Sequence, residues 1–274
     1  MNFDTLVAVV TGGGNGIGRG LALRVAELGA TVAVLDVEEV AAKQVCEEIT
    51  ALGGSAVAIA VDVRDREAVS GAAERIFNEL GKVNLLFNNA GVVVYGPLRE
   101  MRPEDWDWII AVNQFGVTNC LSAFLPGMLE QNDERHIVNT ASVAGLGARN
   151  GLGAYSATKA AIVALSAALR EELEPDGINV SVVCPSNVRT RIDDSDRLRD
   201  PGATVVPVRH HTRPRDLAGR SKALEPTDAA EMILRGVAAR EEIILTDPSW
   251  WPLIKQRIGT IAQAMDDFDT VEKV

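Results

Sequence analysis

The segment Tyr155-Ser156-Ala157-Thr158-Lys159 contains side chains whose types and spacing suggest acid–base chemistry. On a helix, residues four positions apart lie on the same face, so Tyr155 and Lys159 are expected to point the same way. A phenol with an ordinary pKa of about 10 is a poor base at neutral pH. An adjacent ammonium group stabilises the phenolate and lowers that pKa, which predicts that Tyr155 is a general acid and base.

Ser142 follows a short apolar run and can assist this chemistry. Its hydroxyl can donate a hydrogen bond to a carbonyl or alkoxide oxygen and hold that oxygen near the tyrosine. A tyrosine and a lysine four residues apart are also common on ordinary amphipathic helices. The functional interpretation therefore depends on finding a cofactor site elsewhere in the chain.

A glycine-rich segment between an expected strand and an expected helix supplies that site. It contains Gly12, Gly13, Gly14, Asn15, Gly16, Ile17 and Gly18. Glycines at such a turn let the backbone approach a pyrophosphate, and the helix N-terminus offers it free N–H groups and a positive dipole end. Three glycines can also simply make a tight turn, but a strand before and a helix after favour dinucleotide binding.

Asp36, at the end of the second expected strand, strengthens the prediction. A carboxylate there can accept hydrogen bonds from both ribose hydroxyls of NAD and would repel the 2′-phosphate of NADP. Val37, Glu38 and Asn15 offer no positive charge to such a phosphate, so NAD is the expected cofactor. A simple N-cap for the next helix remains an alternative role for Asp36.

Two further segments end expected strands on the same side of the sheet. Asp62 and Val63 follow the third strand, where a carboxylate and a backbone N–H could hold an adenine ring; capping the next helix is the alternative. The small and amide residues Asn88, Asn89, Ala90 and Gly91 end the fourth strand and allow close backbone approach.

Short apolar runs alternate with segments of helical apolar spacing along most of the chain. Strands are expected at 6–10, 31–35, 56–61, 83–87, 137–140, 178–183 and 243–246, and helices at 17–28, 40–52, 67–80, after Pro103, at 154–173 and at 227–239. This alternation indicates βαβ units and a parallel sheet. The sequence thus predicts an α/β fold of the Rossmann type, a doubly wound parallel sheet of about seven strands with helices on both faces, in a single domain over residues 1–274.

Composition limits the classes of partner. The formal net charge of −11 disfavours nucleic acid and anionic membrane surfaces. We find no apolar stretch of the roughly 18 residues that a membrane span needs, no secretory signal and no paired cysteines, so a cytoplasmic protein is expected. His210 and His211 have no cysteine or third histidine nearby, so no metal site is expected.

With the glycine loop, Asp36, Ser142 and the Tyr155–Lys159 pair in this order, the chain resembles the short-chain dehydrogenase/reductase family from about Val7 to about Ile244. The resemblance implies four catalytic residues, Asn113, Ser142, Tyr155 and Lys159, with Asn113 holding a water that links Lys159 to solvent. It implies nicotinamide contacts from Pro185, Val188 and Thr190, and Tyr155 and Lys159 also contacting the cofactor. It further implies a homotetramer or homodimer formed through helices at about 104–130 and 154–173. Ser186 departs from the family, which usually has glycine after that proline.

The substrate is less determined than the cofactor. Candidate substrate contacts are Val94, Tyr95, Ser142, Leu152, Ser186 and Asn187. The segments that would form the pocket, including 143–152, are mainly apolar with few charges, which favours a bulky hydrophobic or aromatic alcohol. The polar segment 193–222 is expected to be an irregular substrate lid or a disordered loop, and 250–274 a helical extension with a frayed end. Tyr95-Gly96-Pro97, 105–110 and Trp250 are loosely similar to bacterial dehydrogenases of aryl-ether benzylic alcohols.

Two other functions fit the same fold. An NADPH-dependent carbonyl reductase would need a basic residue beside Asp36 or at position 15. A non-catalytic NAD-sensing protein would be indicated by the loss of Tyr155 or Lys159, and both are present.

Overall fold

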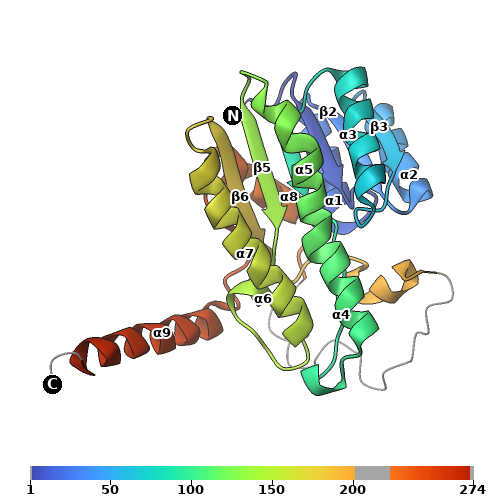
Figure 1. Ribbon diagram of the computed structural model, residues 1–274. Coiled ribbons are helices and arrows are strands. Elements are labelled where there is room, and N and C mark those ends of the chain that lie inside the picture. The colour runs from blue at the N-terminus through green and yellow to red at the C-terminus, as the bar shows by residue number, and fades with distance from the viewer. Residues whose placement is uncertain (1, 201–222, 272–274) are drawn as a thin grey trace.

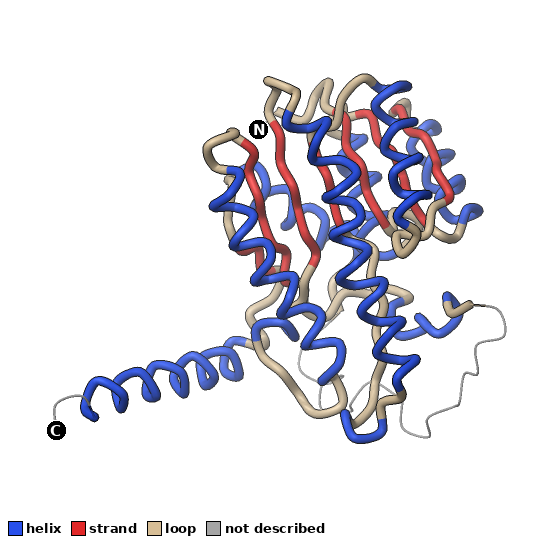
Figure 2. The backbone as a smooth tube through the Cα atoms, viewed as in Figure 1, coloured by secondary structure: helices blue, strands red, loops and turns tan. Residues whose placement is uncertain are grey.

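A seven-stranded parallel sheet forms the centre of the molecule (Figures 1 and 2). The computed structural model describes residues 2–200 and 223–271. The strands, in the order β3-β2-β1-β4-β5-β6-β7, are β1 Val7–Thr11, β2 Thr31–Asp36, β3 Ser55–Ala60, β4 Leu85–Asn88, β5 Arg135–Thr140, β6 Ile178–Cys184 and β7 Ile243–Leu245. The predicted Rossmann-type sheet is confirmed, and most strand boundaries lie within a residue or two of those expected.

Helices cover both faces of the sheet. They are α1 Gly16–Glu27, α2 Glu39–Ala51, α3 Arg66–Leu80, α4 Pro103–Ile110, α5 Gly116–Leu129, α6 Val143–Leu146, α7 Gly153–Leu173, α8 Pro226–Ala238 and α9 Trp251–Val271. One core packs α1, α2 and α8 against the sheet, and a second core on the other face packs α3, α5 and α7. The strands between them are apolar on both sides, as expected for a buried parallel sheet.

The strand order reverses at the centre of the sheet, because β1 lies between β2 and β4. The loops after these strands run in opposite directions and leave a crevice at their carboxyl ends, where ligands bind in open α/β sheets. The glycine loop follows β1 and Asn89-Ala90-Gly91 follows β4, so the predicted cofactor segments lie at this switch point.

The helix expected at about 104–130 after Pro103 spans that range but is less regular than predicted. A π-helical turn, η2 Ala111–Phe115, joins α4 to α5. Over the described ranges 2–200 and 223–271, the continuous helix Pro103–Leu129 is long and apolar enough by composition to cross a membrane, which corrects the expectation of no such stretch. Half of its apolar window is buried, with α5 on α3 and α4 on α7, as in the core helix of a globular fold.

The expectation of irregular structure from 193 onward is wrong for its first residues. A 3₁₀ helix, η3 Ile192–Leu198, extends across the crevice. Ser195 is buried, and its hydroxyl accepts a hydrogen bond from the Val93 amide at 3.2 Å, which fastens η3 to the body. The rest of the predicted lid, including His210 and His211, lies in 201–222, outside the described residues.

The last helix, α9, leaves the body and projects away from it (Figure 1). Its first turns lie near α6, because a side chain at Gly147 would meet Leu253 at 3.2 Å and Ile254 at 3.5 Å. The sequence predicted a frayed end around Asp266 and Asp267, but the helix continues through both to Val271.

Packing between α1 and α8 depends on a glycine. A Cβ atom at Gly20 would lie 2.5 Å from the carbonyl oxygen of Pro226, the first residue of α8. Gly20→Ala therefore forces the two helices apart and is expected to lower the free energy of unfolding by about 1–3 kcal/mol. Gly71→Ala on exposed α3, where the added carbon meets nothing within 4 Å, is the control and should raise it by up to about 1 kcal/mol. Chemical denaturation measures both, and equal stability of the two variants would contradict this account.

Candidate active site

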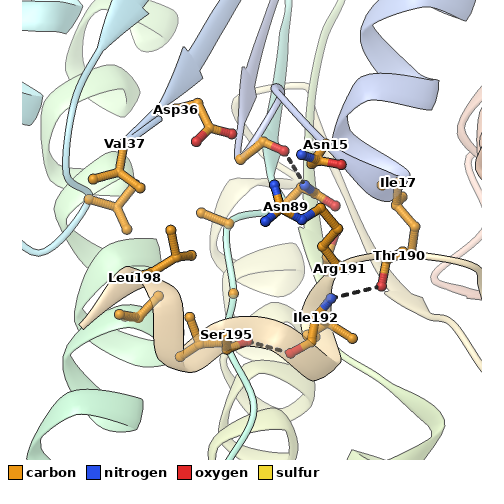
Figure 3. A pocket seen from close by; sticks show the side chains of 18 of the residues that line it. Asn15, Ile17, Asp36, Val37, Asn89, Thr190, Arg191, Ile192, Ser195 and Leu198 are labelled. Atoms are coloured by element: carbon orange, nitrogen blue, oxygen red, sulfur yellow. Dashed lines mark hydrogen bonds between the residues drawn. The ribbon is translucent and has the colours of Figure 1, made fainter. Parts of the chain in front are cut away.

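A continuous cleft runs along the carboxyl ends of the strands from Asp36 on β2 to Lys159 on α7. Figure 3 shows one part of it, with Asn15, Asp36 and Asn89 on one side and Ile192, Ser195 and Leu198 of η3 on the other. The predicted residues that line the cleft are Gly12, Asn15, Gly16, Ile17, Asp36, Asp62, Val63, Asn89, Ala90, Gly91, Ser142, Tyr155, Lys159, Pro185, Ser186, Val188 and Thr190. Gly14, Gly18 and Asn113 lie behind this lining and support it.

The glycine loop packs so closely that side chains are excluded. A Cβ atom at Gly18 would lie 2.0 Å from the carbonyl oxygen of Gly12, and one at Gly16 would lie 2.8 Å from Thr190 Cγ2. Gly12 and Gly16 also adopt positive φ angles of 61° and 51°, which favour glycine. The loop therefore offers backbone N–H groups rather than side chains to the cleft, which suits a pyrophosphate.

Asp36 is held by backbone donors on both sides. Its Oδ2 accepts from Gly14 N and its Oδ1 from Glu38 N, each at 2.9 Å. The N-cap of α2 is Glu38, so Asp36 is not itself the cap considered above. Burial raises the pKa of Asp36 above its ordinary value, and the two backbone hydrogen bonds oppose that rise. A buried carboxylate at the end of the cleft is suited to accept hydrogen bonds from ribose hydroxyls.

Asp62 has a different partner from those expected. Its Oδ2 accepts from Arg64 at 2.6 and 2.9 Å, and Arg64 also pairs with Asp200 at 2.7 Å. The helix cap proposed for it is instead Asp65, which accepts from Glu67 N and Ala68 N. Asp62 still lines the cleft, but its carboxylate is shared with an arginine that the sequence did not associate with the site.

Two more arginines reach the Asp36 end of the cleft from the η3 region. Arg197 pairs with Glu38 at 2.7 Å, and Arg191 lies 3.9 Å from Glu38 and 3.1 Å from Asp194. The prediction of NAD rested on Val37, Glu38 and Asn15, and neither arginine was expected at this site. Each of these cations is already paired with a carboxylate, which limits its attraction for a further phosphate.

Tyr155, Ser142 and Lys159 meet at the other end of the cleft. Tyr155 and Lys159 share a face of α7, and Ser142 follows β5, with a hydroxyl close enough to Tyr155 to favour its phenolate form. Lys159 is buried, its Nζ donates to the Thr140 carbonyl at 2.8 Å, and it lies 5.8 Å from the centre of the Tyr155 ring. The predicted triplet is therefore brought together.

The effect of Lys159 on Tyr155 differs from the sequence expectation. Burial raises the pKa of Tyr155 to about 12, with the hydrogen bond from Ser142 opposing the rise. Burial lowers the pKa of Lys159 to about 8. The ammonium group was expected to bring the phenol toward neutral pH, but it points to a carbonyl, and loss of solvent dominates both groups.

Asn113 lies inside the π-helical turn η2 and is fully buried. Its amide accepts from Val92 N at 2.9 Å and donates to Val92 O and Thr158 Oγ1, each at 3.0 Å. A Cβ atom at Gly91 would lie 3.2 Å from Lys159 Nζ and 3.4 Å from Asn113 Oδ1. Asn113 thus ties the segment after β4 to helix α7 beside the lysine.

The segment after β6 separates into residues that face the cleft and residues that do not. Pro185, Ser186, Val188 and Thr190 line the cleft. The Ser186 hydroxyl lies 3.2 Å from that of Ser249, so the residue that replaces the usual glycine contacts the segment leading into α9. Asn187, an expected substrate contact, is not among the lining residues and instead accepts from Leu224 N through its backbone carbonyl.

A small apolar cluster adjoins Tyr155. Val93, Tyr95 and Leu152 form it, and Ile192 and Trp250 pack against it. Val94, predicted as a substrate contact, lies in the main core, because alternate residues of an extended segment face opposite ways. Tyr95 and Leu152, also predicted as substrate contacts, belong to this cluster and are not among the residues that line the cleft.

Trp108 was also missed as a cleft residue. The sequence favoured a packing role, and the side chain is indeed 7% exposed within the core. It lines the cleft as well, and the Arg199 guanidinium lies 4.1 Å from its ring centre. Among the residues that the structure describes, no group of three or more His, Cys, Asp or Glu could hold a metal ion.

The comparisons with known proteins agree with this architecture. The short chain dehydrogenase family model matches residues 6–200. This chain belongs to the short-chain dehydrogenase family. It is 36% identical to "C alpha-dehydrogenase" of Sphingobium sp. (strain NBRC 103272 / SYK-6) over 90% of this chain and 82% of that protein. It is 35% identical to meso-2,3-butanediol dehydrogenase of Serratia marcescens over 84% and 91% of the two chains.

A solved structure is similar over nearly the whole length. A short-chain dehydrogenase/reductase from Burkholderia phymatum in complex with NAD superposes with a TM-score of 0.88 at 37% identity, covering 96% of both chains. The family expected from the sequence and its enzyme class, an oxidoreductase, are confirmed.

Burial of the Lys159 cation is expected to lower the stability of the fold, although the proposed chemistry needs this residue. Its lowered pKa means that the fold disfavours the ammonium form, so Lys159→Met should raise the free energy of unfolding at pH 7 by about 1–3 kcal/mol. This gain in the free energy of unfolding is complete below about pH 8, where the lysine is charged in both the folded and the unfolded protein. It shrinks as pH rises and is gone above the unfolded lysine pKa of about 10.5.

Denaturation at pH 7 and pH 10 measures the change. Lys43→Met on exposed α2 is the control, since removing its pair with Glu39 should cost under about 1 kcal/mol with little pH dependence over this range. A Lys159→Met protein that is less stable than the parent at pH 7 would contradict this prediction, because it would show that other interactions offset the cost of burying the cation.

Proposed function

We propose that this chain uses NAD to oxidise a secondary alcohol reversibly to a ketone, with Tyr155 as the general acid and base. The observation that carries the proposal is the meeting of Tyr155, Ser142 and Lys159 at one end of the cleft that begins at Asp36. A phenol, a hydroxyl and an ammonium group at that point can bind, orient and deprotonate an alcohol.

In the oxidative direction, Tyr155 as phenolate takes the alcohol proton onto its Oη. Ser142 donates a hydrogen bond to the same substrate oxygen as it becomes a carbonyl. When bound, NAD supplies the hydride acceptor and, in its oxidised form, a positive charge on the nicotinamide ring. A positive charge near the phenol favours phenolate, so the pKa of Tyr155 should fall from its raised value once the cleft is filled.

Lys159 has two roles in this proposal. Its Nζ lies between the Thr140 carbonyl and the cleft, so it can donate to a nicotinamide ribose hydroxyl as well as supply positive charge. Asn113 holds the backbone of Val92 beside it and, through water at the π-helical turn, would pass protons between Lys159 and solvent.

The NAD assignment rests on the fit of the cleft. The proposed cofactor residues are Gly12, Gly14, Asn15, Gly16, Ile17, Gly18, Asp36, Asp62, Val63, Asn89, Ala90, Gly91, Tyr155, Lys159, Pro185, Val188 and Thr190. The glycine loop excludes side chains beside the expected pyrophosphate, and Asp36 offers a carboxylate to the ribose. The similar Burkholderia phymatum structure is a complex with NAD, which supports the same choice.

The substrate face supports a bulky hydrophobic or aromatic alcohol. Tyr95 and Leu152 belong to a small buried apolar cluster against which Tyr155 and Trp250 both pack. The similarity to a C alpha-dehydrogenase points in the same direction, and steroid-like alcohols fit the same surface. Ser186 adds a hydroxyl on the cleft wall that a polar substituent could meet.

A cytoplasmic homotetramer or homodimer stays a prediction. Its expected interface is the pair of long helices around α4–α5 and α7, where Phe115 is 57% exposed and Leu129 is 41% exposed. Self-association through such apolar side chains would be consistent with this arrangement.

Removing the phenol oxygen tests the mechanism. Tyr155→Phe should lower the oxidation rate by about 10²–10⁴-fold, because the general base is lost while the ring remains. Absorbance of reduced cofactor is followed with a panel of aryl carbinols and hydroxysteroids. NADH binding, followed by fluorescence, should persist in the variant. Equal rates for parent and variant would exclude Tyr155 as the base. A parent protein that binds NADH but turns over no alcohol would favour the NAD-sensing alternative.

The cofactor choice is tested at Asp36. Asp36→Ser should lower kcat/KM with NAD by about tenfold or more and raise kcat/KM with NADP, because a repelling carboxylate is lost while Arg191 and Arg197 stay at that end of the cleft. Asp65→Ser removes a carboxylate outside the cleft and leaves a residue that can still cap α3, so it is the matched control and should leave the preference unchanged. A parent protein that prefers NADP would overturn the assignment in favour of the reductase alternative.

A further inference from the structure

Within residues 2–200 and 223–271, which the structure describes, the helix α9 packs on the rest of the protein only through its first turns. From Lys255 to Phe268 its side chains are exposed, and only its first turns lie near Gly147 (Figures 1 and 2). Helices in proteins draw most of their stability from tertiary packing of one face, and Gly259 in the middle of α9 weakens helix formation. The residues that the structure describes supply little such packing to α9 beyond its first turns.

The apolar residues of α9 follow a heptad pattern. Trp251, Ile254, Ile258, Ile261, Met265 and Phe268 are separated by alternating steps of three and four. Five of them are 53–65% exposed, and Ile254 is half-buried near Gly147. A narrow stripe with this period is the seam of a coiled coil, in which each side chain fits between residues of a facing helix.

The charges of α9 are arranged against its own dipole. Lys255 and Arg257 lie in the N-terminal half, and Asp266 and Asp267 lie in the C-terminal half. Positive charge near the N-terminus and negative charge near the C-terminus destabilise a lone helix. The same arrangement becomes favourable when a second copy lies antiparallel, because each basic half then faces an acidic half.

We propose that α9 pairs antiparallel with α9 of a second copy of this chain. The seam is symmetric about the peptide between Gly259 and Thr260, so Ile258 faces Ile261 of the other copy. By the same symmetry Ile254 faces Met265 and Trp251 faces Phe268. Such an interface is isologous and closes as a dimer.

The geometry allows this contact. A helix of 21 residues is about 30 Å long and projects clear of the body, so two copies can overlap along most of their length. The surface is distinct from the α4–α5 and α7 faces expected to associate. An anionic membrane surface fits less well, because α9 carries acidic residues at one end and no basic face along its length.

Charge exchange tests both the contact and its direction. The doubly reversed variant Lys255→Glu with Arg257→Glu should bind its own kind at least about tenfold more weakly, because acidic halves then face acidic halves. The same change suits the dipole of a lone helix better, so lost association cannot be attributed to lost helix propensity. Adding Asp266→Lys with Asp267→Lys should restore association.

The measurement is molar mass by light scattering against protein concentration, on the full chain of 29.2 kDa per copy. The parent is expected to have twice the mass of the doubly reversed variant, and the fourfold variant the parent's mass. A second variant, Ile258→Glu with Ile261→Glu, should also halve the mass while circular dichroism shows the body folded. The proposal would be overturned by a monomeric parent. It would also be overturned if the doubly reversed variant and the Ile258/Ile261 variant both kept the parent's molar mass.

Cysteine cross-linking fixes the orientation. Ile254→Cys with Met265→Cys should form a disulfide between copies under mild oxidation, and Met265→Cys alone should not, because position 265 faces 254 in an antiparallel pair. The parent, whose Cys46, Cys120 and Cys184 are free, gives the background. Efficient cross-linking through Met265→Cys alone would indicate a parallel pair and contradict the proposal.

Discussion

The junction between β1 and β4 holds the two loops on which the site depends. The Thr11 hydroxyl donates to Phe87 O at 3.3 Å and accepts from Asn89 N at 2.9 Å and Ala90 N at 3.1 Å. The Asn89 amide returns hydrogen bonds to Thr11 O and Gly12 O. The backbone hydrogen bonds between β1 and β4 end where the loops diverge at the switch point, and these two side chains take their place there. The glycine loop and the segment after β4 are thereby fixed to one another before any ligand binds.

The other end of the cleft is held under electrostatic strain. Lys159 is a buried cation whose nearest partner is a neutral carbonyl, Thr140 O, and Tyr155 is a buried acid that resists ionisation. Burial disfavours the charged form of each group, raising the pKa of Tyr155 and lowering that of Lys159. An oxidised nicotinamide ring would add the positive charge that phenolate needs, and a ribose hydroxyl would add a partner for the ammonium group. Cofactor binding and the activation of Tyr155 are on this view the same event.

The sequence predicted features that local pattern determines, and it failed where tertiary packing decides. The sheet, the glycine loop and the Tyr155–Lys159 pair follow from periodicity, turn residues and helical spacing. The burial of Asn113 could not be predicted, because a π-helical turn has no clear sequence signal. Arg197 reaches Glu38 only through η3, across 159 positions of chain. Val94 was assigned to the wrong face, since a one-residue error in an extended segment reverses the side.

The C-terminal segment connects the substrate face to the molecular surface. Trp250 packs beside Tyr155 and lies 5.3 Å from the Arg149 guanidinium, and one residue later α9 begins. Ser249, just before it, meets Ser186 on the cleft wall. A helix that is free to swing at its first turn would move Trp250 with it, and a helix fixed along its length would hold the indole in place. Pairing of α9 would therefore organise the substrate face without contributing any residue to the chemistry.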